Sequence, residues 1–297
     1  ATDPDELFTL RNLFWLGLYQ QAVNEALALS IGLTEGLKIE RDEFLNRSYI
    51  ALKQFNKPLK NISESSPTSL QAIKLQATYE SDKDNREIVL LTLNSWLNDS
   101  ISANNPTLQL IAAVIYCQEG NLKEAIKSMR QSVTMEQIAL MAQIYVKMDR
   151  LDLAVIQHKS MLAADEDAPL THLIGALLCL ASGTAKKAQE AAYSFDELID
   201  KYSPSPLLLN GASVAKMHIG EWQEALVNLL DSLKKDPKNP DTLINLITCC
   251  RHLNEPNQKI EDYVNQLKSI DPNHPYIASM KNFESVFSRV SDALALA

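Results

Sequence analysis

The residues that most often bind metal ions or carry out acid-base catalysis are widely spaced in this sequence. No H-E-x-x-H pair places two histidines on one face of a helix, as a zinc hydrolase requires. The five histidines are His158, His172, His218, His252 and His274. Each falls in a different helical segment, so we expect them on helix surfaces or at helix interfaces. The sequence predicts no metal site.

Two short stretches resemble binding loops but lack residues that such loops need. "SGTAKK" (182–187) has one glycine and not the G-x-x-x-x-G-K spacing that surrounds a nucleotide phosphate. "DEDAP" (165–169) offers carboxylates but lacks the length and the glycine of a calcium loop. No G-x-S-x-G or G-x-G-x-x-G is present either. We predict that both stretches are turns between helices, and that the chain is not an enzyme and has no cofactor.

Composition excludes further classes of protein. The 297 residues are 46% hydrophobic and carry a net charge of −9, with no basic face for nucleic acid. No apolar run approaches the ~18 residues of a membrane span, and the first residues lack a secretory signal pattern. The four cysteines lie in helical patterns without metal-ligand spacing: Cys117, Cys179, Cys249 and Cys250. They indicate reduced, buried thiols in a cytoplasmic protein.

The elements that would position any site are helices, as "HIGEWQEALVNLLDSLKKDPKNP" (218–240) illustrates. From Trp222 to Leu233 the apolar residues recur at offsets 0, 3, 4, 7, 8 and 11, which is one face of an α-helix. An upstream helix with apolar residues from Leu208 to Ile219 ends at Gly220, and Asp236-Pro237 ends the second helix. The unit is therefore helix, glycine turn, helix, proline.

This unit recurs along the chain. Similar patterns occur at 13–27, 106–129, 141–162 and 171–198, with a small alanine in the second helix. A period of 29–37 residues built from helix pairs is typical of an α-solenoid. We predict an all-α solenoid of tetratricopeptide-like pairs that forms a superhelix. Residues 1–297 would be one domain of about eight pairs, less regular over 1–104 and more regular over 105–275, with a final helix over 275–293.

In such a solenoid the first helices of the pairs would line a concave groove, which we predict to bind a partner. The predicted groove residues are Leu110, Val114, Cys117, Ala139, Gln143, Val146, Asn210, Val214, Met217, Asn245, Cys249 and His252. Asn210 and Asn245 fall at equivalent places, where their amides could pair with an extended backbone. The alternatives are that each asparagine bonds a neighbouring helix and that the apolar residues only pack between helices.

Several stretches are more specific than the repeat itself. They are "DELFTLRNLFWLGLYQQAVNEA" (5–26), "ERDEFLNRSYIAL" (40–52), "KMDRLDLA" (147–154), "LAADEDAPLTHL" (162–173), "SPSPLLLNGASVAKMHIGEWQEAL" (203–226), "PDTLINLI" (240–247) and "HPYI" (274–277). With these stretches, the chain resembles the coatomer epsilon subunit family. Departures lie in linkers such as "SIGLTEGLK" (30–38) and "SISANNP" (100–106).

The resemblance implies a non-catalytic structural subunit of the coat protein I vesicle coat. It implies that the main partner is the C-terminal region of the coatomer alpha subunit, which the chain would bind and stabilise beside other coatomer subunits. It also implies Golgi-to-ER and intra-Golgi transport, and a cytoplasmic protein peripheral on Golgi membranes and coated vesicles. The alternative function is a peptide-binding tetratricopeptide adaptor or co-chaperone, which needs a groove rich in Lys and Arg.

Overall fold

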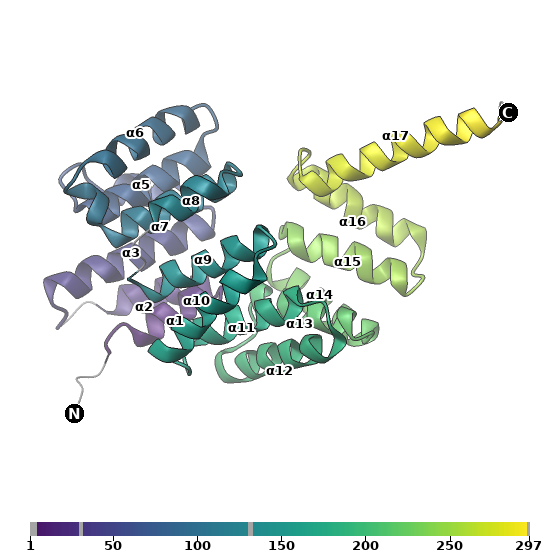
Figure 1. Cartoon of the computed structure of the whole chain (residues 1–297), viewed down its shortest axis with the longest axis horizontal. Coiled ribbons are helices and arrows are strands. Elements are labelled where there is room, and N and C mark those ends of the chain that lie inside the picture. The colour runs from purple at the N-terminus through teal and green to yellow at the C-terminus, as the bar shows by residue number, and fades with distance from the viewer. Residues whose placement is uncertain (1–4, 30–31, 130–132, 296–297) are drawn as a thin grey trace. The chain divides into compact units, whose positions relative to one another are not determined.

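The computed structural model describes residues 5–29, 32–129 and 133–295, and all regular secondary structure in these ranges is helical (Figure 1). The prediction of an all-α chain is therefore confirmed. The chain divides into two compact units, residues 1–182 and 183–297. The sequence predicted one continuous solenoid; its continuity across this division stays a prediction. None of the helices among the described residues is both long enough and apolar enough to span a bilayer.

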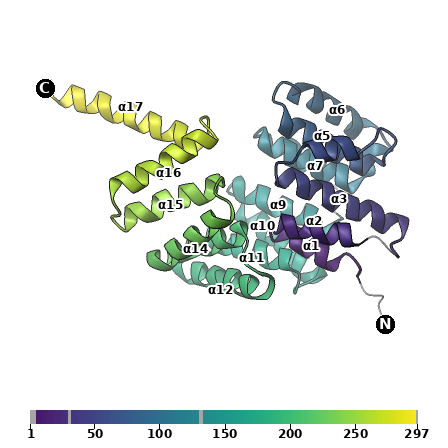
Figure 2. The same ribbon diagram turned by 180° about the vertical axis from the view of Figure 1, so that it is seen from behind.

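Eleven α-helices are described in the first unit. They are α1 (Phe8–Trp15), α2 (Tyr19–Ala28), α3 (Glu35–Ala51), α4 (Asn56–Asn61), α5 (Thr68–Ser81), α6 (Arg86–Asn98), α7 (Pro106–Gln118), α8 (Leu122–Ser128), α9 (Met135–Lys147), α10 (Leu151–Ala164) and α11 (Pro169–Ala181), with a 3-10 turn η1 (Ser102–Asn104). Helices α3, α5 and α7 lie side by side in both views (Figures 1 and 2). Each odd-numbered helix contacts the next one, and α1 also contacts α11. The odd-numbered helices, which are the first helices of their pairs, thus form a closed row within this unit, since α1 contacts both α3 and α11.

The second unit contains six described α-helices. They are α12 (Ala185–Tyr202), α13 (Pro206–His218), α14 (Trp222–Lys235), α15 (Pro240–His252), α16 (Asn257–Ile270) and α17 (Pro275–Ala295). The predicted face of α14 is buried: Leu226 and Leu229 join a core with Leu243, Leu246 and Ile247 of α15. Helix α17 ends two residues later than the predicted 293.

The turns inside the pairs explain the regular glycines. Gly17, Gly120, Gly183 and Gly220 have φ of 76°, 73°, 69° and 87°, a left-handed conformation that costs glycine little. Lys53, Asp149 and Asn254 occupy the same kind of turn with φ of 55–59°. A glycine signal therefore exists for only some of the turns. The short α4, and the α5–α6 turn with no positive φ, depart from the regular helix-pair unit.

Small residues and prolines fix how the pairs pack. The alanines five positions after the left-handed residue are fully or nearly fully buried, as the pattern predicted: Ala22, Ala125, Ala154, Ala188 and Ala225. Proline stands at the first turn of α7, α11, α13 and α15, where a missing N–H costs nothing. Before three of these prolines, the side chain of Asn105, Ser205 or Asn239 caps the helix by accepting a backbone N–H.

Candidate partner-binding site

The predicted groove residues of the second unit already have partners inside the unit. Asn210 Nδ2 donates to Thr242 Oγ1 at 2.8 Å, and Asn245 Nδ2 donates to Asn210 Oδ1 at 2.9 Å. Ser232 Oγ lies 3.2 Å from Asn210 Nδ2 and 2.9 Å from Thr242 Oγ1, so α13, α14 and α15 share one polar network. The interpretation that each asparagine bonds a neighbouring helix therefore describes the observed contacts.

The other predicted groove residues of the second unit differ in exposure. Cys249 is buried, and its thiol donates to the Trp222 carbonyl at 3.2 Å. Burial raises the pKa of the Cys249 thiol to about 11, so it is a neutral packing group at physiological pH. His252 is exposed and stacks on the Trp222 ring with centroids 3.9 Å apart. Val214 and Met217 are half-buried.

The predicted groove residues of the first unit also differ in exposure. Leu110 and Ala139 are buried in hydrophobic clusters, 5% and 2% exposed, because their helices pack against neighbouring helices on that side. For these two and for Cys249, packing between helices replaces the expected groove lining. Gln143 is exposed, and Val114, Cys117 and Val146 are half-buried, so these four leave surface to a partner.

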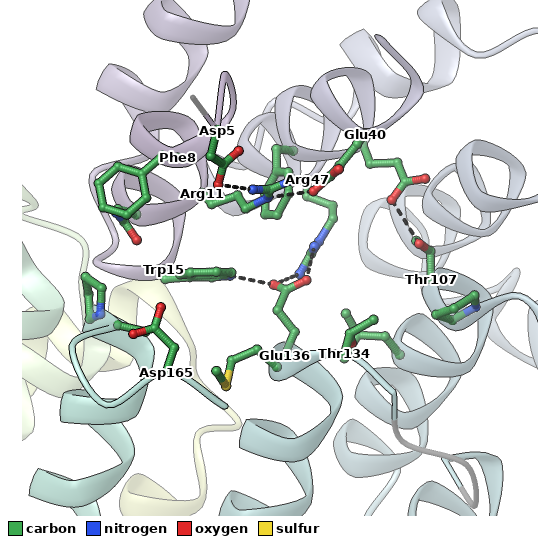
Figure 3. Close-up of a pocket in the computed structure, with 18 of the residues that line it drawn as sticks. Asp5, Phe8, Arg11, Trp15, Glu40, Arg47, Thr107, Thr134, Glu136 and Asp165 are labelled. Atoms are coloured by element: carbon green, nitrogen blue, oxygen red, sulfur yellow. Dashed lines mark hydrogen bonds and ion pairs between the residues drawn. The ribbon is translucent and has the colours of Figure 1, made fainter. Parts of the chain in front are cut away.

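A pocket that the sequence did not predict lies within the first unit (Figure 3). It measures about 550 Å³ and is lined by α1, α3 and the residues at the amino ends of α7, α9 and α11. Of the predicted groove residues only Leu110 lines it. It forms where α1 approaches α9 and α11, so its residues are distant in sequence.

Trp15 and Arg47 converge on the carboxylate of Glu136 (Figure 3). Arg47 donates to Oε2 through Nη1 at 2.9 Å and to Oε1 through Nη2 at 2.8 Å, and Trp15 Nε1 donates to Oε1 at 3.0 Å. The Arg47 guanidinium also lies 4.5 Å from the ring centre of Phe14 and 5.3 Å from that of Phe44. This cluster joins α1 and α3 to α9, and a bidentate arginine-carboxylate pair fixes its geometry.

Three further carboxylates lie beside this cluster: those of Asp5, Glu40 and Glu43. Arg11 bridges Asp5 and Glu40 at 2.6 and 2.7 Å. Glu43 accepts from Thr107 Oγ1 at 2.8 Å, and burial raises its pKa against the opposing effects of hydrogen bonds from Ser69 and Thr107 and the Arg47 charge. No motif marks these residues, because Arg11 and Glu40 are 29 positions apart in the sequence and Glu43 and Thr107 are 64 apart.

In most of the helix pairs, a left-handed turn is followed, five residues later, by a buried alanine in the second helix. This arrangement is typical of a tetratricopeptide-like helical repeat, which is the class of protein. Solved structures agree in fold. A tetratricopeptide repeat protein from Parabacteroides merdae aligns with a TM-score of 0.60 at 12% identity, over 88% of this chain and 96% of that one. A chain of the APC/C hetero-tetramer Cut9-Hcn1 aligns with a TM-score of 0.64 at 12% identity, over 92% of this chain and 54% of that one.

Sequence comparison gives the particular family. The family model described as "Coatomer epsilon subunit" matches residues 3–295. Coatomer subunit epsilon-1 of Oryza sativa is 41% identical over 98% of this chain and 99% of its own length. Epsilon-1 of Arabidopsis thaliana is 39% identical over 98% of each chain, and the Dictyostelium discoideum epsilon subunit is 36% identical over 95% of this chain and 96% of its own. The chain belongs to the coatomer epsilon subunit family.

Proposed function

We propose that this chain is a non-catalytic scaffold subunit of the coatomer coat that binds and stabilises the C-terminal region of the alpha subunit. Its place would be cytoplasmic and peripheral on Golgi membranes and coated vesicles, in Golgi-to-ER and intra-Golgi transport. Membership in the coatomer epsilon family is the observation that carries the proposal. The helical repeat supports it, because repeats stacked side by side present extended surfaces suited to holding another polypeptide.

The accessible members of the predicted groove favour a partner that contributes apolar side chains. Val114, Val146, Val214 and Met217 are half-buried, and none of the twelve predicted residues is Lys or Arg. An adaptor that grips acidic C-termini would need such cations. We therefore propose that, in each unit, the partner contacts the predicted groove residues that remain accessible after helix packing.

Co-purification with the C-terminal region of the alpha subunit tests the proposal. Apolar burial is not screened by salt, so the complex should survive about 0.5 M NaCl, where the Debye length is only a few Å. Val146→Glu and Val214→Glu should each weaken binding about tenfold or more, because they place a charge in the contact. Val155→Glu and Val227→Glu are matched controls at positions already 40% and 66% exposed, and should bind normally.

Two outcomes would contradict the proposal. One is dissociation at moderate salt, which would point to a charged contact instead. The other is equal loss of binding in the control variants, which would show that the partner does not use the predicted groove. Circular dichroism of each variant separates lost binding from lost folding.

A further inference from the structure

We propose that the pocket between α1, α3 and α9 is a receptor for a basic polypeptide segment, whose Arg or Lys side chain enters it. This goes beyond coat membership and beyond the proposed binding of the alpha subunit, because no residue of the pocket other than Leu110 belongs to the predicted groove. The class of ligand follows from three observations on the pocket: its charge, a buried donor without a partner, and its aromatic and apolar walls.

Carboxylates outnumber cations in the pocket lining. The ionisable residues that line it are Asp5, Glu40, Glu43, Glu136, Asp165, Arg11 and Arg47, a formal charge of −3. Helices α7, α9 and α11 begin at the pocket, the first turns of α1 and α3 also line it through Phe8 and Gly36, and each helix N-terminus carries roughly half a positive charge. These five termini offset at most about 2.5 of the three excess negative charges, so the pocket remains negative and favours a cation.

The two arginines of the pocket do not provide an anion site. Arg47 directs both ends of its guanidinium to Glu136, and Arg11 is paired with Asp5 and Glu40 (Figure 3). Glu43 and Asp165, in contrast, have no ion-pair partner among the described residues. An anionic ligand would have to displace a carboxylate from an arginine, whereas a cation would find two carboxylates that are not in a direct ion pair.

A buried donor in the pocket lining indicates that the ligand also carries an acceptor. Asn12 of α1 is only 2% exposed and lines the pocket, yet its Nδ2 has no hydrogen-bond partner. A buried amide left unpaired costs about 1–3 kcal/mol, so such groups normally have a partner. A peptide carbonyl beside a basic side chain supplies that acceptor, which a bare metal cation does not.

The walls suit the long stem and the planar head of a basic side chain. Three aromatic residues, Phe8, Trp15 and Phe44, line the pocket, and Phe8 is 53% exposed. Aromatic rings are therefore available to a cation. Leu110 and Met135 line it further along and can contact the methylene stem. The volume of about 550 Å³ is within the range of pockets that enclose a ligand larger than one ion.

The probe is a capped pentapeptide, acetyl-Gly-Gly-Arg-Gly-Gly-amide, titrated into the full chain. Its matched control contains citrulline, which keeps the shape of arginine and removes the charge. The protein has three tryptophans, so ¹⁵N-labelled indoles give a small set of signals in which Trp15 reports the pocket and Trp96 and Trp222 serve as internal references. We expect a shift of the Trp15 signal at about tenfold lower concentration of the arginine peptide than of the citrulline peptide.

Variants of the two unpaired carboxylates test the contact itself. Glu43→Gln and Asp165→Asn should each weaken the arginine peptide about tenfold and leave the citrulline peptide unchanged. Asp165→Asn retains the acceptor for the Asp167 N–H and lies on the surface, so it keeps the fold if Glu43→Gln does not. Glu87→Gln makes the same change in net charge at an exposed position on α6 outside the pocket, and should bind normally.

Three results would overturn the proposal. The citrulline peptide could bind as well as the arginine peptide, which would show that charge is not recognised. The Trp15 signal could fail to move while Trp96 or Trp222 moves, which would place the peptide elsewhere. Asp165→Asn could bind no more weakly than Glu87→Gln, which would show a general effect of net charge.

Discussion

The Arg47–Glu136 pair should contribute more to stability than any exposed ion pair of this chain. The two side chains are 13% and 18% exposed and are joined by two hydrogen bonds. In Arg47→Met, Glu136 keeps the hydrogen bond from the Trp15 N–H, loses the two from Arg47, and remains as a partly buried carboxylate without a cation. Breaking a buried pair on one side costs about 3–5 kcal/mol, and the residual exposure places this case near 3. For a unit of this size that lowers the Tm by about 6–12 °C.

A double-mutant cycle separates the pair from other effects of the substitution. Glu136→Gln retains an acceptor for Trp15 but leaves Arg47 without its counterion. The double variant Arg47→Met with Glu136→Gln contains neither charge, so it should be more stable than the sum of the single losses predicts, by about 2 kcal/mol. Urea unfolding of each variant, followed by circular dichroism and tryptophan fluorescence, measures the coupling.

The control is the exposed pair of Arg150 and Asp152, whose side chains are 52% and 61% exposed. Arg150→Met removes a guanidinium of the same kind from a site where water solvates the remaining carboxylate, so no measurable change in the urea midpoint is expected. If Arg47→Met loses no more stability than Arg150→Met, or if the two single losses add, the inference that this pair holds α1 and α3 to α9 is wrong.

Three further predictions concern the second unit. Asn210→Ala should lower the free energy of unfolding by about 1–3 kcal/mol, because Ser232 and Thr242 are buried and lose a partner; an unchanged thermal melt with lost partner binding would instead favour the groove-facing interpretation. Gly211→Ala should cost about 1–3 kcal/mol, because its Cβ would lie 2.4 Å from the Phe195 ring, whereas Gly36→Ala, with no atom within 4 Å, should cost nothing in urea unfolding. Cys249 should resist maleimide at pH 8, since a pKa of about 11 in place of 9.0 lowers its thiolate fraction about a hundredfold; rapid labelling confirmed by peptide mass spectrometry would contradict its burial.

The second unit shows how far sequence periodicity reaches. The apolar offsets from Trp222 predict both the helix and the face that it buries, and Leu226 and Leu229 are indeed in the core. Gly220 predicts the turn because glycine adopts the positive φ of this position, 87°, at little cost. These signals are local: each depends on residues within one or two helical turns.

Groove residues were harder to predict, because a helix has more than one face that carries apolar side chains. Leu110, Ala139 and Cys249 share the sequence position of accessible residues, yet they are buried by the adjacent helices. From the sequence, the amides of Asn210 and Asn245 could bond a partner or a neighbouring helix. In the structure, Asn210 bonds the hydroxyls of Ser232 on α14 and Thr242 on α15, and Asn245 bonds Asn210, so these contacts exist only once the helices have packed. Sequence spacing does not distinguish these faces.

Local periodicity and short motifs were enough to predict the helices, their pairing, the glycine turns and the family. The contacts between side chains of distant helices could not be predicted in this way, because they depend on how the helices pack. Trp15, Arg47 and Glu136 form one cluster because α1 and α3 pack against α9, and the adjacent pocket exists for the same reason. Such pairings depend on how several helix pairs stack. The same periodicity repeats in every pair, so it does not show that α1 contacts a helix as distant in sequence as α11.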